Sequence, residues 1–151
     1  MLDKIEENSL IIVKDSYKTE FIRQFRKSGK LFDIKVMGLN ELKKKFYFDF
    51  TKEAVFHVHK KYGVIQEIAE IYLENLYYLR DIDDKKVNFL KEVYQYLKEA
   101  ELLLFDEAFQ KYLQGKAVVL YDLKYIDKFY EKMFEEIGQI ATIKSLQRET
   151  R

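Results

Sequence analysis

Apolar residues at the start of the chain follow a strand pattern, then a helix pattern, then a strand pattern again. Residues 9–13 form a nearly continuous apolar run, and residues 32–37 alternate between apolar and polar. Between them, Tyr17, Phe21 and Phe25 recur every four residues, which is the spacing of one helix face. A strand, a helix and a strand in this order predict two parallel strands joined by a right-handed crossover.

The middle of the chain, residues 40–114, carries helical periodicity almost throughout. Apolar positions within residues 64–79 keep helical spacing, and Asn40 and Thr51 are residue types that begin helices. Gly63 is the only glycine of the region. These helices are too many for one layer against a sheet, so we expect some of them to form a lobe beside it.

Strand patterns return near the end of the sequence, with an amphipathic helix between them. We therefore predict a single α/β domain over residues 1–151, with a parallel sheet of about four strands and a large helical insertion between strands two and three. The sheet resembles a P-loop sheet without the P-loop, and by that analogy the first and third strands are expected to be neighbours. The strands are predicted near residues 9–14, 32–37, 117–122 and 139–146.

Two parts of the sequence are alike, namely residues 10–39 and 118–146. Each has a strand, an Asp just past it, an aromatic-rich helix, a Gly and a second strand. Two explanations stay open at this point. The shared demands of βαβ geometry produce such a likeness, and so does an internal duplication.

The amino-acid composition excludes several kinds of disulfide and metal site. The 151 residues include no Cys, no Pro and no Trp, which excludes a disulfide framework and a thiolate zinc site. The two histidines, His57 and His59, are two apart on a predicted helix, so their side chains point apart and cannot share one metal ion. We therefore assign no metal ligands.

Charge and hydropathy exclude other classes. Lys and Arg total 27 and Asp and Glu total 26, so the net charge of +1 does not make the whole chain attractive to nucleic acid. No apolar stretch is long enough to cross a membrane, and residues 1–10 are too acidic for a secretory signal. We expect a cytoplasmic protein without a membrane partner.

Polar residues that follow the strands are the candidate ligand-binding groups, because ligands of open parallel sheets bind outside the carboxyl ends of the strands. Lys14, Asp15 and Ser16 follow the first strand, and Asp122 and Lys124 follow the third. The 5 glycines all fall at predicted element boundaries, so none is left for a phosphate loop. We accordingly assign no catalytic residue and no cofactor.

Lysines beside aromatic residues are candidates for contact with nucleic acid, through charge and base stacking. A run of three lysines lies directly before the aromatic and apolar residues 46–48. Another lysine follows the third predicted strand. The candidates are Lys43, Lys44, Lys45 and Lys124.

Four segments carry a family resemblance, through their order and spacing: residues 9–13 (SLIIV), 30–46 (KLFDIKVMGLNELKKKF), 69–79 (AEIYLENLYYL) and 117–129 (AVVLYDLKYIDKF). Together they resemble the N-terminal region of helicase–nuclease proteins of low-GC Gram-positive bacteria. Those are AddB-like, RecB-type proteins that carry a PD-(D/E)XK nuclease domain far downstream. The resemblance covers about residues 9–146, nearly the whole chain.

The resemblance implies a non-catalytic, helicase-like N-terminal domain that is a fragment of a larger DNA-end-processing protein. Asp122 matches the position of the Walker B Asp, but the Walker A loop and the nuclease motif are missing, so ATP binding and nuclease activity do not carry over. The implied partners are the remainder of a larger polypeptide, or a helicase subunit, and DNA. Whether the chain is an enzyme stays open, since the full-length family includes ATP-dependent helicase and exonuclease activity.

Two other functions remain open on the residues alone. One is a nucleotide-binding or small enzymatic α/β domain that uses Lys14 and Asp122 at the strand ends. The other is an adaptor that binds a protein partner through its helical lobe.

Overall fold

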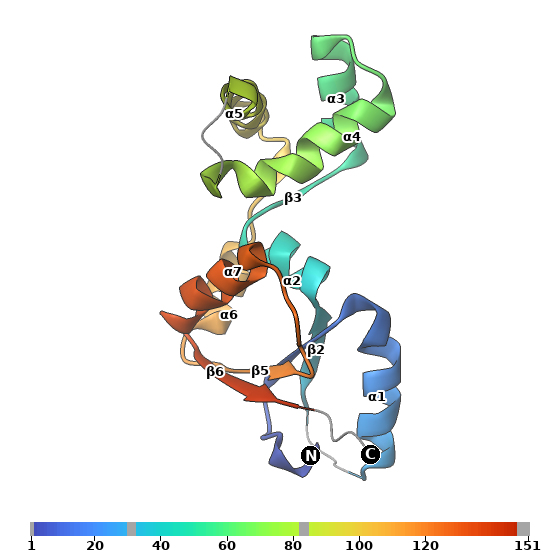
Figure 1. The fold of residues 1–151 in the computed structure, drawn as a ribbon, viewed down its shortest axis with the longest axis vertical. Coiled ribbons are helices and arrows are strands. Elements are labelled where there is room, and N and C mark those ends of the chain that lie inside the picture. The colour runs from blue at the N-terminus through green and yellow to red at the C-terminus, as the bar shows by residue number, and fades with distance from the viewer. Residues whose placement is uncertain (1, 30–32, 82–84, 148–151) are drawn as a thin grey trace. The chain divides into compact units, whose positions relative to one another are not determined.

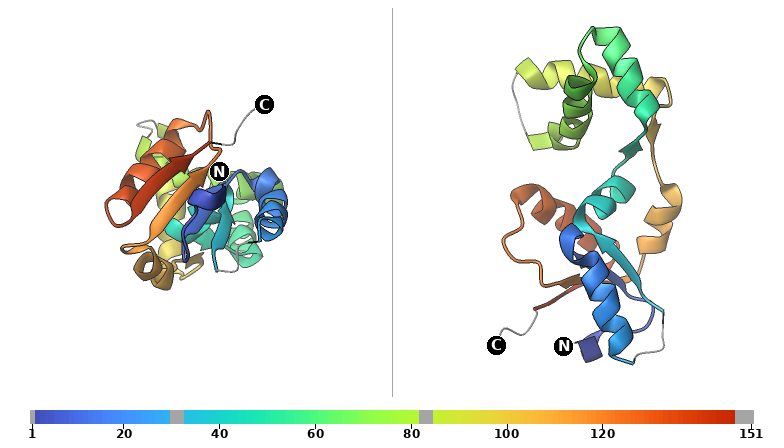
Figure 2. Two further views of the ribbon diagram at one scale, coloured as in Figure 1. Left: turned by 90° about the horizontal axis from the view of Figure 1, so that it is seen from below. Right: turned by 90° about the vertical axis from the view of Figure 1, so that its right-hand side faces the viewer.

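The computed structural model describes residues 2–29, 33–81 and 85–147, and within these residues four strands form a parallel sheet. The strands are β1 (Leu10–Val13), β2 (Lys35–Gly38), β5 (Ala117–Tyr121) and β6 (Thr142–Leu146). They lie side by side in the order β2-β1-β5-β6, which Figure 2 shows in its left panel. The predicted α/β class with a helical region between the second and third strands is confirmed, and so is the pairing of the first strand with the third.

Helices lie on both faces of this sheet (Figure 1). Helix α1 (Lys18–Lys27) connects β1 to β2, and α7 (Lys128–Gly138) connects β5 to β6. The two crossovers step in opposite directions from the centre of the sheet, so right-handed connections place their helices on opposite faces. The strand order therefore reverses between β1 and β5, and this is the point where open α/β sheets bind ligands.

Alternation along the strands separates the two packing layers. Every residue of β1 is buried, because the strand lies at the centre of the sheet and is covered on both faces. The layer under α1 takes alternate residues of the central strands and the buried phenylalanines of α1: Ile11, Val13, Val119, Tyr121, Phe21 and Phe25. On the other face Ile143 of β6 packs against α7, where its Cδ1 lies 3.6 Å from the position of a Cβ at Gly138.

All four predicted strands have slightly different bounds in the structure, and β2, predicted near residues 32–37, runs from Lys35 to Gly38. Two of the other differences have a local reason. Strand β5 ends at Tyr121 because Asp122 adopts a left-handed backbone with φ of 53°. Strand β6 begins only at Thr142 because the N–H groups of Gln139 and Ile140 still donate to carbonyls of α7. Of the predicted strand 32–37, residue 32 lies outside the described residues.

The chain divides into two compact units, residues 1–46 with 107–151 and residues 47–106. We call the first the sheet unit and the second the helical unit. The helices α2 (Leu39–Phe46) and α6 (Glu107–Leu113), predicted as part of the lobe, belong to the sheet unit, where α2 packs against β1 and β2. Whether the two units act as a single domain stays a prediction.

The helical unit contains α3 (Lys52–Tyr62), α4 (Gln66–Asn75), a 3₁₀ segment η3 (Leu76–Asp81) and α5 (Lys85–Glu99). It also contains a strand pair that sequence periodicity missed, because β3 (Asp49–Phe50) and β4 (Leu103–Leu104) have two residues each. Tyr77 stacks on Phe48 with ring centroids 4.3 Å apart and donates a hydrogen bond to the Phe48 carbonyl. Burial raises the pKa of the Tyr77 hydroxyl far above its ordinary value.

Candidate functional site at the carboxyl edge of the sheet

The four parallel strands end at one edge of the sheet, which we call the carboxyl edge. Register pairs Ile12 of β1 with Leu120 of β5, each one residue before the end of its strand, so the loops that follow β1 and β5 begin side by side. We name residues 14–17 the β1–α1 turn and residues 122–127 the β5–α7 loop. They contain or border most of the site residues expected from the sequence.

Asp15 of the β1–α1 turn holds two elements of the fold together. Its carboxylate accepts a hydrogen bond from the Asn40 N–H in the first turn of α2, at 3.1 Å for Oδ1 and 3.3 Å for Oδ2. It also lies against Gly38, where a Cβ would come within 2.1 Å of Oδ1. Asp15, in the turn that follows β1, thus acts as a cap for α2.

The rest of the turn is closed as well. Residues Asp15–Tyr17 form a 3₁₀ segment, η2, in which the Tyr17 N–H donates to the Lys14 carbonyl. The Tyr17 ring stacks on Tyr121 of β5 at an interplanar angle of 3°. Lys18, the first residue of α1, forms an ion pair with Glu41 at 2.8 Å.

This turn occupies the place of a phosphate loop, between a central strand and a helix. Lys18 and Thr19 match the last two positions of the pattern G-x-x-x-x-G-K-[ST], a partial signal that the sequence contains without the glycines. The residue before them is Tyr17 where the pattern has a glycine. Backbone N–H groups that would cradle a phosphate are instead folded into the 3₁₀ segment beside a carboxylate.

The β5–α7 loop is open by comparison. Asp122 and Tyr125 both have positive φ, 53° and 60°, which is uncommon for residues other than glycine. The Asp122 N–H donates to the Leu146 carbonyl at 2.7 Å, and the Asp127 carboxylate caps α7 by accepting from the Tyr130 N–H. Tyr125, which sequence reasoning did not single out, is 101% exposed.

Three lysines at this edge are exposed: Lys14, Lys124 and Lys128. Within the described part of the chain, none of the three has a carboxylate at ion-pair distance. Ser16 is exposed as well. The carboxyl edge therefore brings together the strand-end residues predicted from the sequence, with cations that remain available to an anionic ligand.

The lysine run of α2 is distributed around the helix. Lys43 is only 4% exposed, whereas Lys44 and Lys45 are half-buried, and each of the three residues has an interaction partner in the structure. Consecutive helical residues point about 100° apart, so three lysines in a row cannot all face outward from a helix packed on a sheet. The run is therefore a weaker candidate for phosphate contact than the lysines of the carboxyl edge.

The two histidines lie on α3 in separate environments. His57 Nε2 is 3.8 Å from Glu53, and its Nδ1 is 3.4 Å from the Tyr96 hydroxyl. His59 Nδ1 contacts the Val64 carbonyl oxygen. Across the described ranges, no three His, Asp or Glu side chains are arranged to hold a metal ion.

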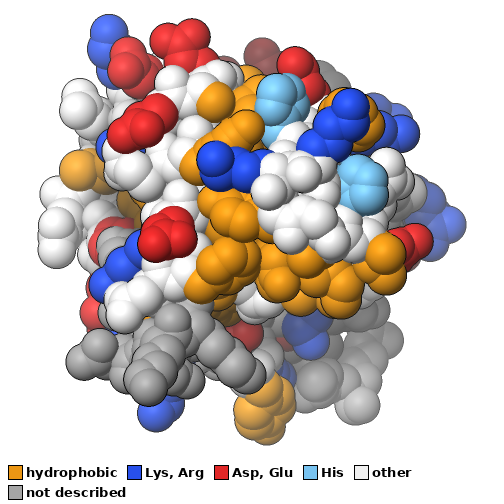
Figure 3. All heavy atoms as spheres, turned by 90° about the horizontal axis from the view of Figure 1, so that it is seen from above, with side chains coloured by type: hydrophobic (Ala, Val, Ile, Leu, Met, Phe, Trp, Pro, Cys, Tyr) orange, Lys and Arg blue, Asp and Glu red, His pale blue; other side chains and the backbone are white. Residues whose placement is uncertain are grey.

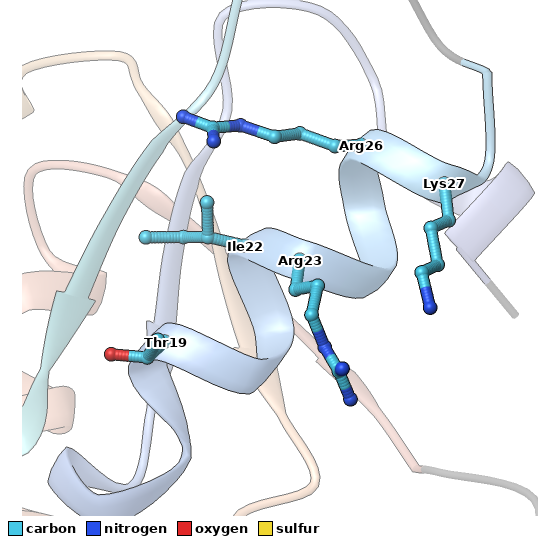
Figure 4. Close-up of a pocket in the computed structure, with 5 residues that line it drawn as sticks. All are labelled: Thr19, Ile22, Arg23, Arg26 and Lys27. Atoms are coloured by element: carbon cyan, nitrogen blue, oxygen red, sulfur yellow. The ribbon is translucent and has the colours of Figure 1, made fainter.

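A shallow hollow lies on the outer surface of α1 (Figure 4) and is lined by Thr19, Ile22, Arg23, Arg26 and Lys27. Figure 4 shows Arg26 extending past one side of the helix and Arg23 and Lys27 past the other. Arg23 pairs with Glu20 at 2.7 Å, and its hydrogen bond, with one from Gln24, lowers the pKa of the Glu20 carboxyl. A single helix forms this hollow, so it does not enclose a ligand.

Exposed hydrophobic side chains gather elsewhere. On the face shown in Figure 3 they form a continuous band, with both histidines beside it. The large hydrophobic residues of the helical unit that remain exposed are Phe56, Ile65, Ile71, Leu104 and Phe105. No helix within the described residues is long and apolar enough to cross a membrane.

No family model, no curated protein and no solved structure matches the chain in comparisons of sequence and fold.

Proposed function

We propose that this chain is a non-catalytic, helicase-like α/β domain of a DNA-end-processing helicase–nuclease-type protein, and that it contacts single-stranded DNA at the carboxyl edge of its sheet. Such a domain would act in the cytoplasm, joined to the remainder of a larger polypeptide or to a helicase subunit. The proposal combines the family resemblance of the four sequence segments with the strand order of the sheet, in which β1 lies beside β5.

The closed β1–α1 turn is the observation that carries the proposal. A phosphate loop offers backbone N–H groups to a nucleoside triphosphate. At this turn the triphosphate would instead meet the carboxylate of Asp15, which accepts from the Asn40 N–H in the first turn of α2. Lys18, the residue in the place of the phosphate-binding lysine, is already paired with Glu41. These contacts favour a domain that keeps the architecture of an ATPase sheet but no longer binds a nucleotide at this turn.

The cations that remain suit a polyanion better than a small anion. Lys14, Lys124 and Lys128 are exposed and follow two neighbouring strands of the sheet, β1 and β5, rather than a single strand. A strand of nucleic acid presents phosphates at intervals and tolerates such spacing, whereas a nucleotide needs its ligands around one point. The carboxyl edge is therefore the surface that we assign to DNA.

A titration with a labelled single-stranded oligonucleotide at two salt concentrations tests the proposal. We expect binding that weakens as salt rises, and a further loss of affinity in Lys124→Glu. Lys98→Glu, at an exposed lysine of α5, is the matched control and should leave the affinity unchanged. Absence of salt-sensitive binding, or a rise in melting temperature with magnesium-ATP, would overturn the proposal.

A role as a protein-binding adaptor is the second candidate. It is favoured by the five large hydrophobic residues that stay exposed in the helical unit, because single exposed hydrophobic residues are common, whereas several in one small unit are typical of a protein-binding surface. If the oligonucleotide fails to bind at both salt concentrations and ATP also has no effect, this candidate becomes the better account.

A further inference from the structure

Tyr125 lies in a conformation that the fold does not explain. Its side chain is 101% exposed, and its φ of 60° is one that bulky L-residues rarely adopt. An aromatic ring in water contributes nothing to the core, so neither packing nor backbone preference favours a tyrosine at this position. A residue that is unfavourable for the free domain is a candidate for contact with a ligand.

The surroundings of Tyr125 indicate which ligand. Lys124 precedes it and Lys128 begins α7 three residues later, and both are exposed without a carboxylate partner among the described residues. The nearby Asp127 carboxylate is already engaged with the N–H of Tyr130. In the sequence, Tyr125 thus has on each side a lysine without a carboxylate partner, in a loop that also carries Asp122 and Asp127.

A protein partner fits this surface less well. Within the described part of the sheet unit, Tyr125 is the only large hydrophobic residue that is exposed, since the others all lie in the helical unit. Protein interfaces bury a tyrosine among further large apolar side chains, whereas the apolar neighbours of Tyr125 in the loop, Leu123 and Ile126, are only partly exposed. An exposed ring with lysines on both sides matches the way single strands are bound, by stacking of a base and pairing of its phosphates.

We propose that Tyr125 is a base-stacking residue for single-stranded nucleic acid, with Lys124 and Lys128 contacting the phosphates on either side of the stacked base. This inference rests on the proposed function and names the contact through which that function operates. The ring stacks without reading the base edge, so the contact is tolerant of sequence.

The absence of tryptophan provides a direct reporter. Tyr125→Trp places a single indole in a chain that has none, and stacking of a base on it quenches its fluorescence. Two probes of about ten nucleotides are compared, an oligothymidylate and an abasic strand with the same phosphates. Ile65→Trp, at another exposed position, is the control reporter, and Tyr125→Ala is titrated against both probes.

We expect the oligothymidylate to quench Tyr125→Trp but not Ile65→Trp, and the abasic strand to quench neither. Tyr125→Ala should lose about tenfold in affinity for the oligothymidylate and nothing for the abasic strand. If the unsubstituted protein binds neither probe, the proposed function fails and this inference with it. If it binds the oligothymidylate while Tyr125→Ala binds as tightly, or loses affinity equally for both probes, the stacking role alone is overturned.

Discussion

The sheet is built from two similar βαβ halves, yet the segments that follow their first strands are used differently. In the first half, Asp15 caps α2 across the sheet, Tyr17 stacks on Tyr121 and Lys18 pairs with Glu41. In the second half, Tyr125 is fully exposed in the β5–α7 loop. The segment after β1 thus makes contacts that stabilise the fold, whereas the side chain of Tyr125 in the segment after β5 is exposed to solvent.

This difference teaches where to look for function in a sheet of this kind. At a strand end whose residues contact other elements of the fold, as after β1, polar residues have partners, and substitution there should change stability. At a strand end that does not, a strained and exposed side chain has no structural partner, and substitution should change binding. Four stability measurements probe this contrast, and we take them from the largest expected effect to the smallest.

Gly38→Ala should cause the largest loss, about 2–4 kcal/mol of unfolding free energy. The new Cβ would lie 2.1 Å from Asp15 Oδ1 and 3.1 Å from Asp15 Cα, so rotating the carboxylate alone does not relieve the clash. Gly138→Ala is the control, because its Cβ would meet only Ile143 at an ordinary 3.6 Å. Urea unfolding that shows equal stability for the two variants would contradict the close packing of the β1–α1 turn.

Tyr17→Ala should cost about 2 kcal/mol, because the half-buried ring contacts Tyr121 and Phe21 and its hydroxyl donates to Gln24. Tyr125→Ala removes the same side chain from the other half and should change stability by less than about 0.5 kcal/mol. The pair is measured by thermal unfolding. Similar losses in both variants would mean that the two halves do not differ as described.

Asp15→Ala removes the cap of α2 and should cost about 1 kcal/mol. Asp15→Asn keeps an oxygen that accepts from the Asn40 N–H, so it should lose less than the alanine variant. Chemical unfolding ranks the two. An alanine variant as stable as the parent would show that the carboxylate is free for another role at this edge.

Tyr125→Asn should raise stability by about 0.5–1 kcal/mol, which is the smallest effect of the four. Asparagine tolerates a φ of 60° better than tyrosine, and no packing is lost because the ring touches solvent only. A small rise in melting temperature is the expected readout. A loss would indicate that the ring supports the loop, in conflict with its assignment to a ligand.

The sequence predicted the α/β class, the four-stranded parallel sheet and the helical region between its second and third strands, but only part of the site. Continuous apolar runs predict β1 and β5 well, because buried central strands leave a strong pattern. The alternation over residues 32–37 predicts β2 less well, since that strand runs from Lys35 to Gly38. The pair β3–β4 left no such pattern, since two residues have no periodicity. Glycine and aspartate residues predict where the strands end. The left-handed backbone of Asp122 makes β5 end one residue earlier than predicted.

The roles of the site residues depend on contacts that one-dimensional spacing does not contain. Asp15 reads as a possible ligand until Asn40, 25 residues away, is seen to donate to it. Lys43 reads as a surface cation, but the phase of its helix turns it inward. Tyr125 gives no signal at all, because its exposure and its positive φ appear only in the folded loop.

The central claim is that nucleic acid binds the β5–α7 loop while the β1–α1 turn stays closed to nucleotides. Amide NMR spectra of the isotope-labelled protein, titrated with oligothymidylate and separately with magnesium-ATP, test it residue by residue. We predict that the oligonucleotide shifts the amide signals of residues 122–128 and that ATP leaves those of residues 14–19 unchanged. ATP-induced shifts at residues 14–19, or an oligonucleotide that leaves residues 122–128 unperturbed, would contradict it.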